Sequence, residues 1–199
     1  MPWTELTALL LFATAMSFTP GPNTTLAAAL AANGGLPRAM PFVLGVPVGW
    51  GLLLLACALG LGGVLQAAPV LRGAIKWLGL ACMCWLAWKL AHADRLAAAD
   101  PARFEVGFVK GVMLQFVNIK AWMNALLISA GWVTVADPIG PRLAVVLPLM
   151  MAYGLASNFT YAWLGSALRG WLQQGTRLRV FNRVLAGVLV ATALWMSRW

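Results

Sequence analysis

The sequence predicts an all-α integral membrane protein, a bundle of about six transmembrane helices with little chain outside the bilayer. Two observations support this fold class. First, 62% of the 199 residues are hydrophobic and only 10% are charged, whereas a soluble domain carries roughly 25% charged residues. Second, a hydrocarbon core roughly 30 Å thick requires about 20 apolar residues per helix. Six such helices with short connections therefore account for nearly the whole chain.

Apolar runs and the breaks between them place the six helices. The expected spans cover about residues 6–32, 40–65, 70–91, 107–131, 143–167 and 180–197. No basic residue precedes the first apolar run, so this run is expected to be a retained span and not a signal peptide. Residues 1–199 then form a single transmembrane domain, with a first repeat of about 5–92, a connection of about 92–106 and a second repeat of about 107–199.

Polar interruptions at similar depths in spans one and four indicate that the two halves are related. Thr19-Pro-Gly-Pro-Asn23 interrupts the first span, and Asn118-Ile-Lys120 places polar groups in the fourth. Three helices per half would give the halves opposite orientations. Such inverted repeats are common in secondary transporters, where interrupted helices at corresponding positions point to the binding site.

The positive balance of the chain, 14 Lys and Arg against 5 Asp and Glu, sets the expected orientation. In so apolar a chain we attribute the excess to cytoplasmic loops, which accumulate Lys and Arg, and expect no nucleic-acid partner. With both termini outside, the cytoplasmic side holds Arg38, Lys89, Arg95, Arg103, Lys110, Arg169, Arg177, Arg179 and Arg183, against Arg72, Lys76, Arg142 and Arg198 on the other side. This nine-to-four distribution favours both termini outside the cytoplasm.

The interruption at Pro20, Gly21, Pro22, Asn23 and Thr24 is the most informative stretch for function. Proline removes a backbone donor and clashes with the preceding turn. Backbone freed in this way is tolerated in hydrocarbon only against protein or a water-filled cavity. The helix that restarts after Pro22 presents a partly positive amino end, to which a small carboxylate could bind. A proline kink that only shapes the bundle explains the pattern equally well.

Lys120 is the only charged residue expected near the middle of a span. An ammonium at that depth costs at least about 2.5 kcal/mol on insertion scales, so such residues usually face a cavity and serve function. Asn118 lies two residues before it, and both side chains face one cavity only if the helix unwinds between them. The alternative is that the span is misplaced and Lys120 reaches a membrane interface.

A polar stripe on the fifth span supplies the remaining candidates. Tyr153, Ser157 and Tyr161 recur at four-residue spacing, with Asn158 beside them. The stripe could line a substrate path or form a hydrogen-bonded seam between helices. Small residues that indicate close helix contacts are Gly45, Gly49, Gly51, Gly107 and Gly111.

The chain lacks the residues that a proton relay, a metal site or an enzyme active site would require. No Asp or Glu falls within an expected span, and His92 is the single histidine. Neither a carboxylate proton relay nor a metal site is therefore expected, and there is no residue set that indicates an enzyme or a cofactor. The three cysteines, Cys57, Cys82 and Cys84, all fall in apolar stretches, where thiols pack as small apolar groups.

Five stretches together carry a family resemblance: Thr19-Pro-Gly-Pro-Asn23, Gly35-Leu-Pro-Arg38, the Gly45/Gly49 spacing, Trp85-Leu-Ala-Trp-Lys89 and Leu114-Gln-Phe-Val-Asn-Ile-Lys120. At these residues the chain resembles the LysE-type amino-acid exporters, in the branch that includes homoserine and threonine exporters. Most of that family has Asn-Pro-Lys where this sequence has Asn118-Ile-Lys120. The missing proline weakens the expectation that span four is broken like span one. The run ending at Lys120 looks most like the cysteine and O-acetylserine exporters.

The resemblance implies a secondary exporter in a bacterial plasma (inner) membrane, multi-pass, with both termini periplasmic. It would move a small neutral amino acid or derivative, with cysteine and O-acetylserine as candidates, by alternating access. Its partners would be this substrate and the lipid bilayer, and homo-oligomerisation stays open. In this interpretation Asn23 and Lys120 hold the substrate carboxylate, and polar groups of span five contact its amine or side chain.

Two other classes of protein are alternatives to an exporter. A membrane thiol-disulfide electron carrier needs two cysteines that meet across the halves, whereas all three cysteines fall in spans two and three. A membrane scaffold without transport activity would leave Lys120 unexplained.

Overall fold

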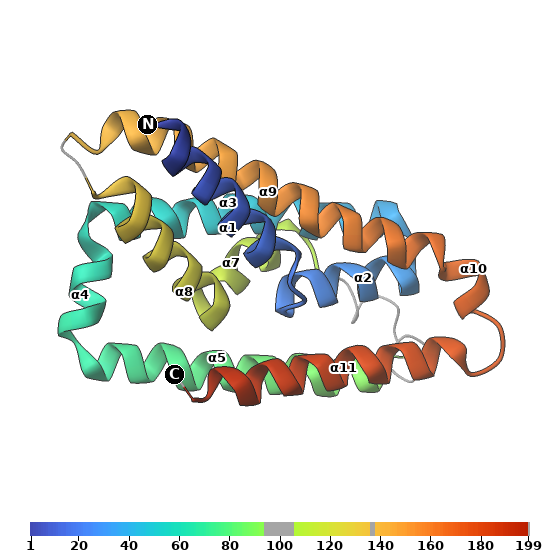
Figure 1. Ribbon diagram of the computed structural model, residues 1–199. Coiled ribbons are helices and arrows are strands. Elements are labelled where there is room, and N and C mark those ends of the chain that lie inside the picture. The colour runs from blue at the N-terminus through green and yellow to red at the C-terminus, as the bar shows by residue number, and fades with distance from the viewer. Residues whose placement is uncertain (94–105, 136–137, 199) are drawn as a thin grey trace.

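The computed structural model describes residues 1–93, 106–135 and 138–198, and every regular element in these ranges is a helix. The helices form an elongated bundle (Figure 1). Their bounds are α1 Trp3–Phe18, α2 Pro22–Gly34, α3 Leu36–Ala56, α4 Gly62–Ala67, α5 Pro69–Ala91, α7 Phe108–Val117, α8 Ile119–Ile128, α9 Gly140–Ala167, α10 Arg169–Leu172 and α11 Arg177–Met196, with π-helical turns η1 Cys57–Leu61 and η3 Ser129–Val133. Most of the expected connection at 92–106 lies outside the described residues.

Four helical stretches are long and apolar enough to cross a membrane: Leu36–Leu65, Pro69–Ala91, Gly140–Ala167 and Arg177–Met196. A fifth results if α7 and the helix that follows it, bent by 73°, count as one span. These match expected spans two to six. The first expected span is instead divided into α1 and α2, which are 16 and 13 residues long. The described residues thus contain four or five candidate crossings, and the sixth stays a prediction.

The fourth span is broken although it lacks the proline, so the weakened expectation of a break there was too cautious. Asn118 has an extended backbone, with φ −90° and ψ 104°, and separates α7 from α8. Its side-chain oxygen accepts a hydrogen bond from the backbone N–H of Lys120 at 3.1 Å. An asparagine that caps a helix in this way replaces one missing backbone partner. The cap makes the break possible without proline.

Glycines bring α3 and α7 into backbone contact. A Cβ atom at Gly45 would lie 2.2 Å from the carbonyl oxygen of Phe108, and one at Gly49 would lie 2.4 Å from that of Val112. The expected close helix contact is confirmed at these positions. At Gly107 nothing lies within 4 Å of such an atom, so the prediction was wrong there, because this residue precedes the contact region.

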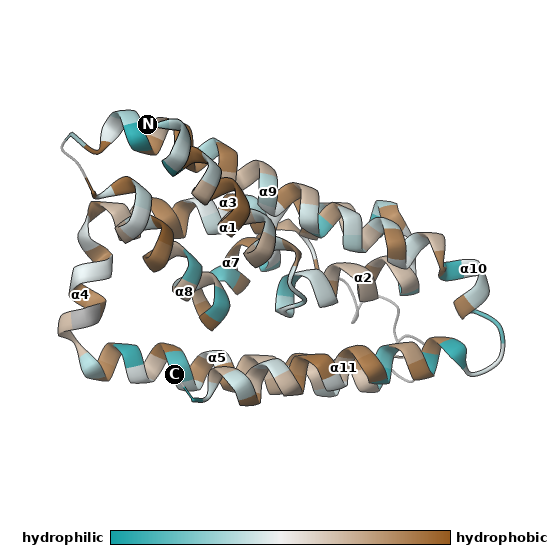
Figure 2. Ribbon diagram, viewed as in Figure 1, coloured by the Kyte–Doolittle hydropathy of each residue, from teal (hydrophilic) through white to brown (hydrophobic). Residues whose placement is uncertain are grey.

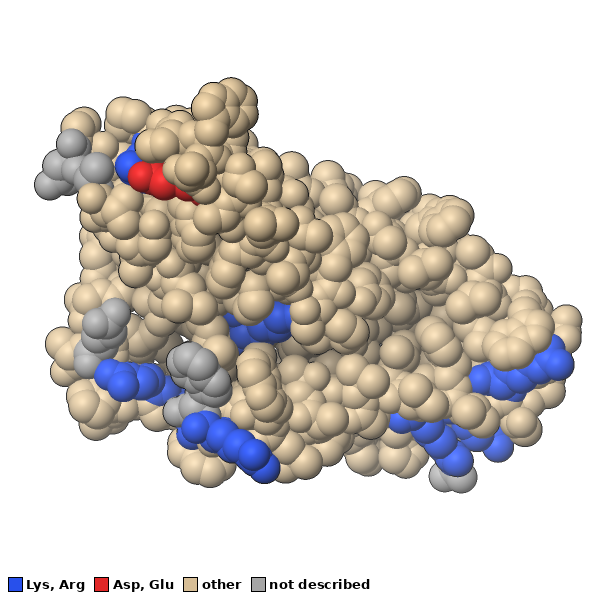
Figure 3. Space-filling view, in the orientation of Figure 1, with Lys and Arg blue, Asp and Glu red and all other residues tan. Residues whose placement is uncertain are grey.

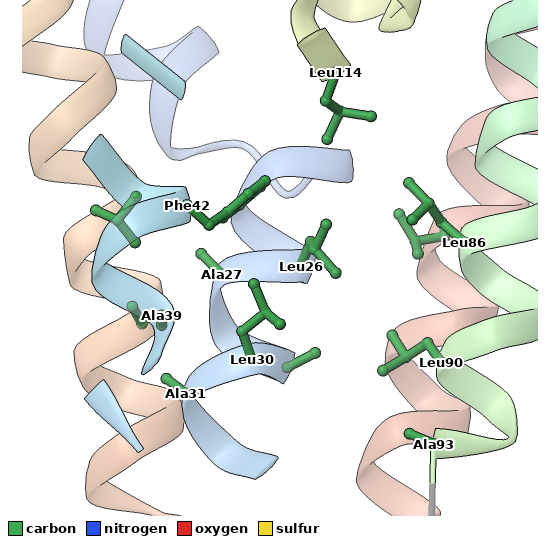
Figure 4. Close-up of a cluster of buried hydrophobic side chains, with 14 of the residues drawn as sticks. Leu26, Ala27, Leu30, Ala31, Ala39, Phe42, Leu86, Leu90, Ala93 and Leu114 are labelled. Carbon is green, nitrogen blue, oxygen red and sulfur yellow. The ribbon is translucent and has the colours of Figure 1, made fainter. Parts of the chain in front are cut away.

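The helix α2 is buried almost entirely within protein. All residues from Leu26 to Ala32 are buried, and Leu26 and Leu30 belong to one apolar cluster with Phe42 of α3 and Leu86 of α5 (Figure 4). Gly21 and Pro22, where the helix restarts, are buried as well, whereas Thr19 and Pro20 are exposed. The backbone groups at the restart of the helix therefore need not face lipid.

The helices α5 and α11 pack against each other along one side of the bundle (Figure 1). A reciprocal pair of amide hydrogen bonds joins this pair to α2, with Asn33 donating to Asn182 at 3.0 Å and Asn182 donating to Asn33 at 3.2 Å. Asn182 is 1% exposed. A buried amide pair of this kind fixes the position of α11 relative to α2, since any shift would leave two polar groups unsatisfied.

Candidate functional site

The two helix breaks meet near the middle of the molecule, where the starts of α2 and α8 carry hydrophilic residues between apolar helices (Figure 2). At the first break the chain is extended through Gly21, and Pro22 occupies the first position of α2. Proline suits that position because its missing N–H would have no partner within the helix. The hydroxyl of Thr24 accepts a hydrogen bond from the N–H of Gly21 at 3.0 Å. This bond stabilises the restart of the helix.

A network of side-chain amides connects the two breaks. Asn23 on α2 donates to Gln115 on α7 at 2.8 Å, and Gln115 donates back to Asn23 at 3.2 Å. Asn118, at the second break, donates to the same oxygen of Asn23 at 3.3 Å. Gln115 is fully buried and also donates to the carbonyl of Gly111 at 2.9 Å. Asn23 and Asn118 were predicted site residues, whereas Gln115, which joins them, was not among the predicted residues.

Lys120 extends from the second break to the first. Its ammonium donates to the carbonyl oxygen of Thr19, just after α1, at 2.7 Å. The last carbonyls of a helix lack backbone partners and carry partial negative charge, so a cation is stabilised there. A Cβ at Gly21 would lie 3.1 Å from Cδ and 3.2 Å from Nζ of Lys120. The absence of a side chain at Gly21 therefore makes room for the lysine.

These groups surround a cavity of about 70 Å³, which is large enough to hold water or a small solute. Eight of the eleven predicted site residues line it: Gly21, Pro22, Asn23, Thr24, Asn118, Lys120, Ser157 and Asn158. Other lining residues were not among the predicted site residues, and they include Trp50 of α3 and Asn124 of α8. Asn124 lies one helical turn after Lys120, and this spacing places the two on one face of the helix.

The remaining three predicted residues lie outside the cavity lining. The hydroxyl of Tyr161 donates to the carbonyl of Phe18, the last residue of α1, at 2.8 Å. The hydroxyl of Tyr153 lies 3.3 Å from that of Thr14 in α1. Both tyrosines thus attach α1 to α9, which fits the helix seam that was the alternative interpretation of the stripe. Pro20 is part of the break but not of the lining.

Two side-chain oxygens at the cavity have no hydrogen-bond partner among the described residues. They are the Oδ1 atoms of Asn124 and Asn158, and both are buried. The amide nitrogen of Asn158 donates to the carbonyl of Gly154 at 2.8 Å, which orients its oxygen away from that carbonyl. Buried acceptors normally have a partner. Both residues line the cavity, and the two oxygens themselves are enclosed by protein atoms.

The charge at the cavity is uncompensated by any acidic lining residue. Lys120 contributes a cation and the start of α2 a partial positive charge, and none of the residues that line the cavity is Asp or Glu. No group of three or more His, Cys, Asp or Glu within the described part of the chain could hold a metal ion. The cavity can therefore bind a small anionic or zwitterionic solute through Lys120 and backbone donors.

The LysE type translocator family model matches residues 14–197. The chain belongs to the LysE family. Cysteine/O-acetylserine efflux proteins are among its relatives: that of Klebsiella pneumoniae is 30% identical over 192 residues, 96% of each chain. That of Salmonella typhimurium is 29% identical over 182 residues, 89% of this chain and 90% of the relative, and that of Escherichia coli K12 is 28% identical over 193 residues, 96% of each.

No solved structure matches this LysE family chain. Family membership confirms the resemblance seen at the two interruptions, and it makes the chain a membrane translocator. The cavity between the breaks is accordingly the candidate place at which the transported solute binds.

Proposed function

We propose that this LysE family protein exports a small neutral amino acid or derivative from the cytoplasm, with cysteine and O-acetylserine as the first candidates. The relatives named as cysteine/O-acetylserine efflux proteins support this substrate class. The observation that carries the proposal is the cavity between the two breaks, which combines a cation with buried acceptors that have no partner among the described residues. An amino-acid zwitterion offers the complementary pair of charges.

The carboxylate of the substrate binds the ammonium of Lys120 and the amino end of α2. The first backbone N–H groups of a helix have no partner within it and attract an anion. Thr24 and Asn118 stand beside this position and line the same cavity. Charge-assisted hydrogen bonds of this kind are roughly twice as strong as neutral ones, so they supply most of the affinity.

The ammonium of the substrate binds the Oδ1 atoms of Asn124 and Asn158 once these two lining side chains turn toward the cavity. Both oxygens are buried and have no partner among the described residues, and an ammonium has three donors with which to satisfy them. Neutral acceptors fit a neutral amino acid, because a second substrate cation would find no acidic partner among the lining residues. The cavity of about 70 Å³ also favours a short side chain.

The ammonium of Lys120 donates one hydrogen bond to the carbonyl of Thr19, and its two other N–H groups can bind the carboxylate at the same time. The bond to Thr19, at 2.7 Å, is one of two that hold the end of α1, the other being the bond from Tyr161. At its start α1 is held by the ion pair between Glu5 and Arg142 at 2.8 Å. Lys120 would therefore link the bound carboxylate to the end of α1, so that substrate binding is coupled to the position of this helix in alternating access.

The proposed topology follows from the same pair of breaks. Residues 1–199 form one transmembrane domain, with inverted repeats at about 5–92 and 107–199 and six crossings, α1 and α2 together making the first. The helix α1 begins and α11 ends toward the same end of the molecule (Figure 1), as an even number of crossings requires. With the basic excess at the opposite end, both termini would be periplasmic in a bacterial plasma membrane.

The thiol-disulfide carrier has less support. Cys57, Cys82 and Cys84 are all free thiols. Cys57 belongs to a cluster with Leu53 and Trp122, whereas Cys82 packs against the separate cluster around α2. Electron transfer through a disulfide would need two of these thiols within bonding distance.

A counterflow assay in proteoliposomes tests the proposed function. Vesicles loaded with unlabelled L-cysteine or O-acetyl-L-serine should accumulate the labelled solute, and L-lysine should not compete. Cysteamine, which is cysteine without its carboxylate, should compete at least tenfold less well than cysteine, since it lacks the group bound by Lys120. Equal competition by cysteamine would refute the carboxylate site. Absence of counterflow with every neutral amino acid tested would refute the substrate class.

A further inference from the structure

A second cavity, of about 290 Å³, lies between α4, the first turns of α5, α8 and the end of α11. It shares no lining residue with the central cavity. Most of its wall is apolar, and includes Leu65, Trp122 and Leu127. An apolar cavity of this size is a poor place for water, which needs two to four polar partners.

Two cations form part of this otherwise apolar wall. Arg72 and Lys76 both line the cavity, and at four-residue spacing they share one face of α5. They lie within the first eight residues of this membrane-spanning helix, so they stand near the bilayer surface. Lys and Arg groups are visible at this end of the molecule in the space-filling view (Figure 3). The cavity thus has a basic rim next to an apolar interior.

We propose that an anionic phospholipid binds here, with an acyl chain in the cavity and its phosphate between Arg72 and Lys76. Lipid hydrocarbon surrounds these helices and fills a void between them more favourably than water does. Basic pockets between transmembrane helices bind anionic headgroups. A neutral lipid would gain nothing from the two charges, and free phosphate would gain nothing from the apolar wall. This site is independent of the proposed transport activity.

Native mass spectrometry of the full chain in detergent tests the proposal, with phosphatidylglycerol, phosphatidylcholine and glycerol phosphate as probes. Each basic group near an anionic surface contributes roughly a fivefold gain in affinity. The double variant Arg72→Gln, Lys76→Gln should therefore bind phosphatidylglycerol roughly thirtyfold more weakly. The matched control is Arg179→Gln, Arg183→Gln, an exposed pair at the same spacing at the start of α11, and it should bind like the parent.

A third variant, Leu127→Trp, tests the acyl chain separately. Leu127 lines the cavity and is 46% exposed, so tryptophan can occupy the cavity without disturbing the buried core. It should weaken phosphatidylglycerol binding while both cations remain. Equal binding of phosphatidylglycerol and phosphatidylcholine by the parent would overturn the proposal. So would parental binding by the double variant, unchanged binding by Leu127→Trp, or binding of glycerol phosphate as strong as that of the lipid.

Discussion

Replacement of Lys120 by methionine tests the proposed site most directly. The change keeps the length and the apolar stem but removes the ammonium that bonds Thr19 at 2.7 Å. Loss of that charged hydrogen bond costs roughly 1.5–3 kcal/mol, while removal of the buried charge recovers at least about 2.5 kcal/mol on insertion scales. The two terms nearly cancel. Lys120→Met should therefore insert and fold at parental levels.

In Lys120→Met the loss of substrate affinity is not offset by a second free-energy term. Loss of one charge-assisted hydrogen bond to the carboxylate, about 1.5–3 kcal/mol, corresponds to roughly a 10- to 150-fold weaker affinity. Counterflow of L-cysteine in proteoliposomes, measured at equal protein content, should fall accordingly. Lys120→Arg should retain part of the activity, because its planar guanidinium is bulkier and Gly21 leaves little spare room beside the side chain.

Lys110→Met is the matched control, because Lys110 is an exposed lysine on α7, before the same break. It should transport like the parent. If Lys120→Met transports at the parental rate with normal membrane levels, the lysine is a structural residue and the carboxylate site is wrong.

Two further predictions rest on contacts in the structure, and a third rests on the distribution of basic residues. Gly21→Ala should reduce counterflow several-fold, because its Cβ would lie 3.1 Å from the Lys120 chain, whereas Gly187→Ala, with nothing within 4 Å, should have no effect in the same assay. Gly45→Ala should lower stability by about 1–3 kcal/mol, since its Cβ would lie 2.2 Å from the carbonyl of Phe108; a melting temperature equal to that of Gly187→Ala would contradict this contact. A reporter fused after the last residue should be active as a periplasmic marker and inactive as a cytoplasmic one, and the opposite pattern would invert the topology.

Much of the fold could be predicted from the chain alone. Expected spans three, five and six differ from α5, α9 and α11 by at most three residues at either end, because an apolar run of this length has few alternatives to a helix in lipid. The interruption of the first span was also predicted, because two closely spaced prolines around Gly21 remove backbone donors and disfavour a regular helix. Boundaries and breaks of this kind are local properties of the chain.

The second break, at Asn118, could not be predicted from the local sequence. Nothing in Asn118-Ile-Lys120 forbids a helix, and the chain bends there because the side chain of Asn118 caps α8 while its amide bonds Asn23. That second bond joins residues 95 positions apart. Such a contact depends on how α2 packs against α7, and this packing cannot be predicted from the residues around Asn118.

Tertiary packing also decides which residues of the polar stripe on α9 line the cavity and which contact another helix. The four-residue spacing correctly grouped Tyr153, Ser157 and Tyr161 on one side of a helix, but only packing decides what each one meets. The two tyrosines contact α1, whereas Ser157 and its neighbour Asn158 line the cavity. Sequence by itself thus determined a helical membrane protein with an interrupted first span and a lysine within the fourth. Tertiary structure alone decided which polar groups meet around that lysine, because helices distant in the chain supply them.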